Sequence, residues 1–310
     1  MTLPRISFPS GSRRGSALVL VFWCLILLSI AIVGLVEMVE LSVEHTTSHD
    51  LQVQARALAE SGVALGTYPQ ILKDDPLLLQ QVAPGRSFKV NIQSEGARLN
   101  LNYILETGHR DVLMNLFTRW GLTLDEANHV IDCLTDWISP TGLRSLNGAV
   151  AADYAAAGLP QRPSGKPFVS LDEVSLVMGF ELVEKAKPDW QDSFTLWSSG
   201  PLNVNEAPAA LIAAVFDLDD SRVDPMVNAR NGKDGIAGTA DDVPIQSMNQ
   251  LQADLGLSQL QMQTLGNMVS LSDPYRRVES VGQAGQCQVK VSVVTQINAT
   301  PPQYLLWSEQ

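Results

Sequence analysis

Residues 16–36 form an uncharged and strongly apolar run close to the amino terminus. A helix over this run is long enough to cross the hydrocarbon core of a bilayer, which is roughly 30 Å thick. A cleaved secretory signal would have a shorter apolar core followed by a small-x-small site and a turn, and the sequence after residue 36 has neither. The run therefore predicts a membrane anchor.

The anchor continues into a polar segment that is compatible with a helix. Apolar residues recur every three or four positions as far as Leu65, with charged and polar residues between them, which is the pattern of an amphipathic helix. Pro69 and the turn-forming residues 74–76 end the pattern. The sequence predicts one helix from residue 16 to about residue 68, roughly 75 Å long, half in lipid and half packed on an exported domain.

Charge differs on the two sides of the anchor. Three arginines precede it and three glutamates follow it: Arg5, Arg13, Arg14, Glu37, Glu40 and Glu44. Because positive charge is retained on the cytoplasmic side, we expect the amino terminus in the cytoplasm and the bulk of the chain on the other side of the membrane. The whole chain has 33 acidic and 21 basic residues, a net charge of −12. Such a surface repels phosphate backbones, so we expect no nucleic-acid partner.

The chain has 3 cysteines, and Cys24 lies in the apolar run. Only Cys133 and Cys287 are left to form a disulfide across the exported part. Cys133 falls on a helical apolar stripe and Cys287 on an alternating strand pattern, where an unpaired cysteine is an ordinary small hydrophobic residue. The pattern favours two unpaired cysteines, and a disulfide between them is the alternative.

Strand patterns occur at both ends of the exported part. Residues 88–93 alternate between apolar and polar side chains and predict the first strand. Three more strands are predicted near the carboxyl terminus, at 275–281, 287–297 and 304–307. We expect Gly282 and Gly285 to mark a hairpin turn, and all these strands to form one sheet against the long helix, because isolated hairpins are only marginally stable.

The middle of the chain has helical patterns instead. Capping boxes begin at Thr123 and at Ser170, each with a glutamate three residues later. Apolar stripes predict helices at 111–120, 124–138, 149–157, 171–178, 207–216, 247–256 and 258–270. The predicted fold class is therefore α+β: a long helix on a small antiparallel sheet, interrupted by a large helical insertion.

A short sequence recurs inside the helical part. Leu-Asn-Leu-Asn at 99–102 opens one helical group, and Leu-Asn-Val-Asn at 202–205 opens another. We expect the second asparagine of each motif to cap the helix that follows it. The repeat predicts two related helical bundles, at about 99–195 and 200–273.

The order of these features resembles one protein family. A basic leader that ends in Gly15 directly before the apolar run is similar to the class III signal of type IV pilins and type II secretion pseudopilins. The motifs at 99–102, 135–137, 177–180 and 202–208, with the closing residues 275–282 and 306–309, resemble the K-type minor pseudopilin of type II secretion systems. The chain departs from the major-subunit pattern, because Ser16 replaces the usual first Phe and Leu20 the usual fifth Glu. It also has Ile138-Ser139 where family members often carry another Asp, which argues against a metal at that turn.

The resemblance implies a pilin-like fold with a SAM-like insertion and a structural role. Prepilin peptidase would remove the leader, residues 1–15, by cutting between Gly15 and Ser16, and would methylate Ser16. The domain order would be a transmembrane half-helix (16–36), a pilin-like helix and first strand (37–98), the inserted helical domain (99–273) and closing strands (274–310). The subunit would stand at the tip of the type II secretion pseudopilus, prime its assembly and support protein export across the outer membrane. Its implied partners are the I-type and J-type minor pseudopilins, other pseudopilins, prepilin peptidase and secreted substrates.

An oxygen-rich, glycine-containing stretch at residues 231–242 suggests a metal site. The candidate ligands are Asp234, Thr239, Asp241 and Asp242, because clustered carboxylates on a flexible loop suit calcium. The acidic spacing does not match an EF-hand. Members of the resembled family bind calcium in the helical insertion, and a solvated acidic loop is the alternative. Further aspartates with less support are Asp217, Asp219, Asp220 and Asp224.

The sequence contains no nucleophile elbow, phosphate-binding loop or dinucleotide fingerprint. We therefore predict that the protein is not an enzyme. The alternative function is that of a membrane-anchored periplasmic DNA-uptake protein, since paired helical motifs with glycine turns can bind duplex backbones. The acidic balance argues against it.

Overall fold

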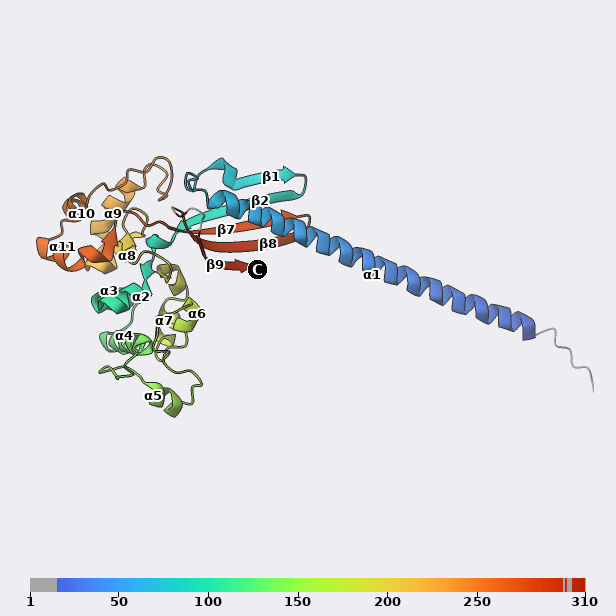
Figure 1. Cartoon of the computed structure of the whole chain (residues 1–310), viewed down its shortest axis with the longest axis horizontal. Helices are drawn as coiled ribbons and strands as arrows, with labels where there is room; N and C mark the ends of the chain where they lie inside the picture. Colours follow the sequence, from blue (N-terminus) through green and yellow to red (C-terminus); the bar gives the residue numbers. More distant parts are fainter. Residues whose placement is uncertain (1–15, 298, 300–302, 310) are drawn as a thin grey trace, which may run out of the picture.

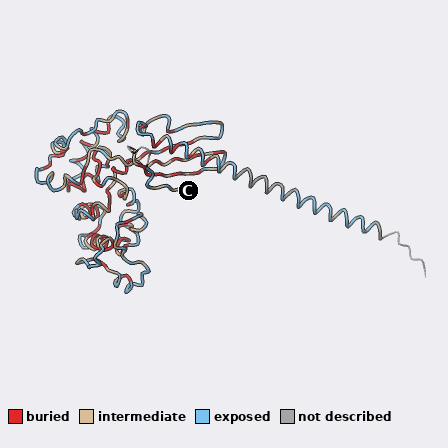
Figure 2. Tube along the Cα trace, in the orientation of Figure 1, coloured by how far each residue is buried: buried red, intermediate tan, exposed pale blue. Residues whose placement is uncertain are grey.

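The computed structural model describes residues 16–297, 299 and 303–309. Its longest element is helix α1 (Ser16–Gly66), which leads from a free end into a sheet-containing body (Figure 1). The apolar segment Leu18–Leu35 is long and apolar enough to span a membrane, and none of it is buried, as the exposed trace of this half in Figure 2 shows. The long helix predicted from residue 16 is thus present, and it ends at Gly66.

The carboxyl-terminal half of α1 packs on a five-stranded sheet (Figure 1). The strand order is β1-β2-β7-β8-β9, and all neighbouring strands are antiparallel. The strands are β1 (Leu79–Ala83), β2 (Arg86–Ser94), β7 (Tyr275–Ala284), β8 (Cys287–Gln296) and β9 (Gln303–Glu309). This body, formed by the second half of α1 and the sheet, confirms the predicted α+β fold with a helix on an antiparallel sheet.

Small residues allow α1 to lie close to the sheet. Ala55 and Ala59 are completely buried on the helix face that meets β7. At Gly282 an added Cβ would lie 2.0 Å from the carbonyl oxygen of Ala55. The prediction that Gly282 belongs to the hairpin turn is therefore wrong, because it lies within β7 and makes room for the helix. Gly285, with φ +58°, does occupy the turn between β7 and β8.

The sheet has one strand more than predicted. The first strand is β1, not the strand expected at 88–93, and β1 forms the sheet edge beside β2. All five residues of β1 are exposed or half-buried, so its sequence Leu-Gln-Gln-Val-Ala carries no alternation that would identify it. An edge strand needs only one neighbour and no buried face, and for this reason periodicity does not find it.

The helical insert joins β2 to β7, which are neighbours in the sheet. It lies at the end of the body farthest from the free half of α1 (Figure 1). Its helices are α2 (Leu101–Thr107), α3 (Arg110–Arg119), α4 (Leu124–Ile138), α5 (Ala151–Ala156), α6 (Leu171–Val174), α7 (Glu181–Ala186), α8 (Ala209–Phe216), α9 (Asp220–Arg230), α10 (Met248–Leu255) and α11 (Gln259–Leu265). Single turns of 3-10 helix lie at Pro76–Leu78, Glu95–Ala97, Trp190–Ser193 and Gly266–Met268.

Two short parallel pairings divide the insert into two units. Strand β3 (Leu99–Asn100) pairs with β4 (Phe194–Thr195), and β5 (Leu202–Asn203) pairs with β6 (Val269–Ser270). We call the chain closed by the first pairing, 99–195, unit 1, and that closed by the second, 202–270, unit 2. One hydrophobic core runs through both units and is separate from the core of the body. The insert is therefore a single packed mass attached to the body.

Several helices of the insert differ from the sequence prediction. The periodic pattern does not reveal α2, α7 or α9, and the helices predicted at 171–178 and 258–270 end earlier. In α9 the buried positions are held by Val223, Met226 and Arg230, and Pro225 lies inside the helix. A charged residue on the buried face and a proline together hide this helix from an analysis of apolar spacing.

The repeated asparagines have roles other than the predicted ones. The first asparagine, Asn100, caps α2 by accepting a hydrogen bond from the Tyr103 N–H, so the prediction that the second one is the cap is wrong. Asn102 instead donates to the carbonyl oxygen of Phe168 and accepts from its N–H, both at 2.9 Å. Asn205 does the same with Ile245, at 3.1 and 2.7 Å. In both units the second asparagine therefore fixes a distant loop.

Candidate functional site

The oxygen-rich stretch forms a closed loop between α9 and α10. We call residues 231–242 the acidic loop, which is closed by a hydrogen bond of 2.8 Å from the Val243 N–H to the carbonyl oxygen of Arg230. Carboxylate oxygens of Asp234, Asp241 and Asp242 lie within 4.8 Å of one another. The fold therefore brings together the three acidic residues that the sequence analysis names.

Backbone N–H groups and one hydroxyl hold the carboxylates in place. Asp241 accepts hydrogen bonds from the Lys233 N–H at 2.6 Å and from the Thr239 hydroxyl at 3.0 Å. Asp242 accepts from the Gly238 N–H at 2.6 Å, and Thr239 also donates to it at 3.3 Å. The backbone hydrogen bond from Lys233, followed by that from Thr239, lowers the pKa of Asp241, so this carboxylate is ionised at neutral pH.

Glycines give the acidic loop its shape. Gly232 and Gly238 have φ values of +68° and +90°, which side chains disfavour. A Cβ at Gly232 would lie 2.6 Å from both the carbonyl oxygen and the carboxylate of Asp241. These glycines therefore allow the backbone to curl tightly around the carboxylates.

A buried arginine, Arg230, lies directly before the acidic loop and holds its first residue in place. The Arg230 guanidinium donates to the carbonyl oxygens of Val204 and Ala207, at the start of unit 2, and to the Asn231 side chain. Burial lowers its pKa to about 10, which still leaves it charged at neutral pH. Arg230 therefore ties the first residue of the acidic loop to the segment that opens unit 2.

The donor set of the acidic loop fits a hard cation. It offers only oxygen atoms from three carboxylates, a hydroxyl and nearby carbonyls, which is the chemistry that calcium prefers. Two of the carboxylates are exposed and one is half-buried, so an ion has access from solvent. The less supported aspartates do not join this cluster: Asp217 ends α8 in a left-handed conformation, and Asp220 pairs with Arg119 at 2.7 Å.

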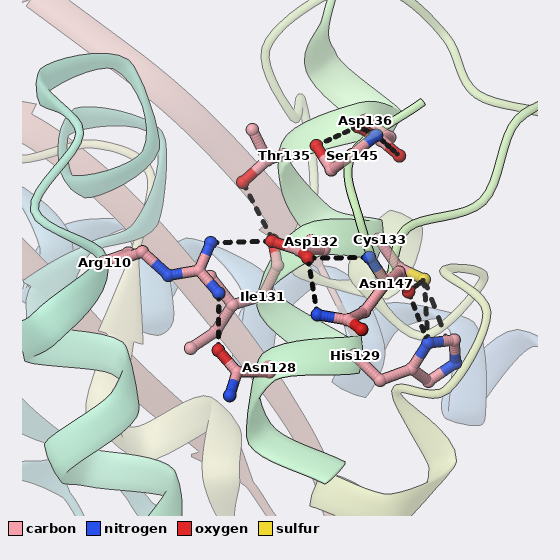
Figure 3. A network of polar contacts seen from close by, with 10 residues as sticks. All are labelled: Arg110, Asn128, His129, Ile131, Asp132, Cys133, Thr135, Asp136, Ser145 and Asn147. Carbon is pink, nitrogen blue, oxygen red and sulfur yellow. Dashed lines mark hydrogen bonds and ion pairs between the residues drawn. The ribbon is translucent and has the colours of Figure 1, made fainter. Parts of the chain in front are cut away.

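Unit 1 has a loop in the corresponding position, after α4, that is held in another way (Figure 3). We call residues 139–150 the anchored loop. Two buried carboxylates of α4, Asp132 and Asp136, which are 4% and 2% exposed, accept its N–H groups. Asp136 accepts from the Ser145 N–H and, at 2.6 Å, from its hydroxyl, and Asp132 accepts from the Asn147 N–H at 3.0 Å. Asp136 belongs to the 135–137 motif of the family resemblance, but apolar periodicity does not reveal the role of this pair, although two acids one turn apart in an otherwise buried helix indicate one.

Further contacts in Figure 3 secure Asp132 and the base of the anchored loop. Burial alone would raise the pKa of Asp132, but hydrogen bonds from Arg110 and Asn147 and the Arg110 charge hold it below its usual range. The Asn147 carbonyl also contacts His129 Nδ1 at 2.6 Å. Burial, followed by the charges of Asp136 and Asp132, raises the pKa of the Cys133 thiol to about 12, so Cys133 acts as core packing and not as a nucleophile.

The two cysteines that could pair lie in different cores. Cys133 belongs to the core of the insert, whereas Cys287 begins β8 and packs against the core of the body.

The proposed cleavage residue Gly15 lies outside the described residues. Ser16 is the first residue of α1, and its side chain is also outside the described part.

One of the two predicted capping boxes forms completely. At Thr123 both hydrogen bonds of the box are present. At Ser170 the side chain accepts from the Glu173 N–H, but the Glu173 carboxylate accepts from the Val169 N–H and the Trp137 side chain and not from Ser170.

Comparisons with known proteins agree with the architecture. Residues 97–188, most of unit 1, match the family model of the type II secretion system (T2SS), protein K. No curated protein matches the sequence. A chain in the crystal structure of the GspK-GspI-GspJ complex from the enterotoxigenic Escherichia coli Type 2 Secretion System shares the fold, with a TM-score of 0.65 and 16% identity over 88% of this chain and 99% of that chain. Residues 97–188 are therefore similar to protein K of the type II secretion system, and the chain as a whole shares the fold of a chain in the GspK-GspI-GspJ complex.

Proposed function

We propose that this minor pseudopilin stands at the tip of the type II secretion pseudopilus, where it primes assembly and supports protein export. The observation that carries the proposal is the position of the insert, which covers the end of the body opposite the free half of α1 (Figure 1). In a fibre whose subunits stack along their first helices, such a mass leaves no space for a subunit above. Leu20, 65% exposed, supports the same position, because by the resemblance a carboxylate here would pair with the amine of a neighbouring subunit and Leu20 supplies none.

The proposed partners are the I-type and J-type minor pseudopilins, because the similar solved structure is a GspK-GspI-GspJ complex. The first half of α1 would leave the inner membrane and bury its apolar surface among the helices of these partners. The body would be periplasmic, and the role would be structural and not catalytic. Contacts with other pseudopilins and with secreted substrates belong to the same proposal.

Co-purification tests this function. The tagged full chain is extracted in mild detergent from cells that produce all minor pseudopilins, and we expect the I-type and J-type subunits to elute with it in fixed proportion. Deleting the I-type or J-type subunit should remove the assembled complex and stop secretion. A full chain that elutes alone from secreting cells contradicts the proposal.

Processing at Gly15 belongs to the same proposal and has its own test. We expect the mature protein to begin with methylated Ser16, as measured by mass spectrometry of its first peptide. Gly15→Leu should leave the leader attached, because a branched side chain replaces the small residue before the cut. Gly11→Leu, in the same leader, is the matched control and should be cleaved normally. A mature chain that begins upstream of Ser16 argues against processing as a pseudopilin.

We also propose that the acidic loop binds calcium through Asp234, Asp241 and Asp242, with Thr239 as a further oxygen donor. When bound, calcium would neutralise the three clustered carboxylates and fix the loop. Calcium at millimolar concentration should raise the melting temperature of the detergent-solubilised chain by several degrees, since a ligand that binds only the folded state stabilises it. Asp241→Asn should abolish this increase, whereas Asp224→Asn, an exposed control on α9, should retain it. An unchanged melting temperature in the wild-type chain would reject calcium binding.

A further inference from the structure

The insert and the body have separate cores and meet across a polar joint. On the unit 1 side, the completely buried Glu95 accepts hydrogen bonds from Arg277 of β7 at 2.5 Å and from Thr195 of β4. On the unit 2 side, packing is incomplete. A cavity of about 120 Å³ lies between the surfaces there, and Ser94 is one of its lining residues. The Ser94 hydroxyl is buried and is one of the described polar groups without a hydrogen-bond partner. Apart from the packing of β5 on the turn at Glu95–Ala97, individual polar contacts join unit 2 to the body.

Lys73, in the loop that follows α1, makes most of these contacts. Its Nζ lies 2.8 Å from the carbonyl oxygen of Ala237 and 3.0 Å from the carboxylate of Glu206. Its backbone N–H donates to the Gly238 carbonyl at 3.2 Å. The neighbouring Asp74 accepts from the Ala240 N–H at 3.4 Å. We call these contacts of Lys73 and Asp74 with unit 2 the lysine clasp.

The lysine clasp contacts the same backbone segment that donates hydrogen bonds to the carboxylates of the acidic loop. The Gly238 carbonyl accepts from Lys73, while the Gly238 N–H donates to Asp242. A Cβ at Gly238 would lie 2.7 Å from Cε of Lys73, so the lysine side chain lies directly against this backbone. Lys73 and Glu206 are only 22% and 25% exposed, which shields their ion pair partly from solvent. The clasp and the carboxylate cluster therefore share one short segment, 237–242.

We propose that the acidic loop is a cation-controlled fastener between the insert and the body, and that calcium bound there tightens the lysine clasp. The inference rests on the proposed calcium site. An ion held by Asp241 and Asp242 restricts the backbone at 237–240, so the carbonyl groups that accept from Lys73 are fixed before the clasp closes. Calcium would in this way set how firmly the insert is seated on the body.

Coupling of this kind is reciprocal, because if calcium strengthens the clasp, the clasp must strengthen calcium binding by the same factor. Electrostatics alone predicts the opposite. An ammonium group near the loop repels a dication, so removing its charge without any coupling would make calcium bind more tightly. Weaker calcium binding after removal of the ammonium group therefore indicates a fastener, whereas tighter binding indicates a simple charge effect.

The test compares Lys73→Met with the wild-type full chain in detergent, using calcium alone as the probe. Lys73→Met keeps most of the side-chain stem and removes the ammonium. We expect calcium affinity, measured by isothermal titration calorimetry, to fall on the order of tenfold. In the wild-type chain, calcium should also slow amide exchange of residues 72–75, since the Lys73 N–H donates into the loop. Lys187→Met is the matched control, because Lys187 pairs with Asp189 inside unit 1, and it should leave both measurements unchanged.

Each other outcome overturns the inference. If calcium raises the melting temperature but Lys73→Met binds it equally or more tightly, the fastener is rejected while the calcium site stands. The fastener is likewise rejected if amide exchange at 72–75 does not respond to calcium. If calcium leaves the melting temperature of the wild-type chain unchanged, the calcium site and the fastener fail together. A folding control accompanies these tests: a single cooperative melting transition of Lys73→Met in the absence of calcium shows that the variant is folded and that the affinity difference does not come from misfolding.

Discussion

The two units of the insert each contain a long loop, and they hold it in place in different ways. Each has a long loop after the second of two packed helices, α4 in unit 1 and α9 in unit 2. The carboxylates that hold the anchored loop come from the buried face of α4, whereas those of the acidic loop lie in the loop itself and are largely exposed. The first arrangement is complete once unit 1 folds. The second leaves clustered negative charge that is accessible from solvent.

The two units also differ in how the charge of their carboxylates is compensated. Asp132 has Arg110 at 2.6 Å as its counterion, so the buried charge is compensated within unit 1. Among the described residues, the three clustered carboxylates of unit 2 have no ion pair of their own. A loop built like the anchored loop is a fixed part of the fold, and a loop built like the acidic loop is suited to regulation.

The strongest test of this contrast is Asp136→Ala in unit 1. The substitution leaves the N–H and hydroxyl of Ser145 without their buried acceptor and frees the anchored loop. We expect the free energy of unfolding to fall by about 3 kcal/mol, because breaking a buried charged network is costly. Urea denaturation of the detergent-solubilised chain, followed by tryptophan fluorescence, measures this change. Asp125→Ala, an exposed aspartate on the same helix, should change it little.

Calcium affinity should be unaffected by Asp136→Ala, since the anchored loop is separate from the acidic loop. A loss of calcium binding in this variant would break the comparison, because it would mean that the two units are not independent. A loss of stability below about 1 kcal/mol would also break it, because the anchored loop would then not depend on its buried carboxylate.

The repeated asparagines sharpen the comparison with an intermediate effect. Asn102→Ala and Asn205→Ala each remove a pair of hydrogen bonds to a distant loop, and Asn205→Ala also removes a hydrogen bond to the Leu271 carbonyl oxygen. Each substitution should cost about 2 kcal/mol. Only Asn205→Ala should also weaken calcium binding, because its partner Ile245 follows the acidic loop in sequence. Parallel urea titrations and calcium titrations of the two variants measure both effects. Equal calcium affinity in the two variants would separate Ile245 from the acidic loop.

The smallest expected effect concerns acid pH. The pKa of Asp132 is lower in the folded protein than in the unfolded chain, so its stabilising contribution is present above the ordinary aspartate pKa of about 4 and is lost as pH falls below it. Asp132→Asn should therefore weaken the dependence of melting temperature on pH between about 4 and 2. Thermal melts of both chains across this range test the point. Parallel curves for the two chains would show that Asp132 does not contribute to acid unfolding.

The elements that the sequence predicts well have regular apolar spacing or clear capping signals. Strands β2, β7 and β8 each bury side chains on one face, and helix α4 begins and ends where its capping box and stripe predict. Where a chemical role replaces an apolar side chain, the prediction fails. Arg230 occupies a buried position of α9, and Asp132 and Asp136 occupy buried positions of α4, so a search for apolar periods passes over the residues that hold both loops.

The candidate site was accessible to sequence reasoning only in part. Clustered aspartates and glycines indicate the acidic loop, and the fold brings Asp234, Asp241 and Asp242 together. Lys73 could not be predicted, because its contact with Ala237 joins residues 164 positions apart and a single lysine after a helix has no distinguishing pattern. Calcium and cleavage after Gly15 remain predictions.

The body accepts the insert between β2 and β7, two strands that lie side by side and run in opposite directions. A short turn would be enough to connect them, so the fold of the body does not depend on the length or content of the segment between these two strands. A module inserted here can be enlarged, shrunk or reshaped without disturbing the pairing of β2 with β7 or the packing of α1 on the sheet. A single lengthened connection can in this way add a second hydrophobic core to the chain while the first one stays intact.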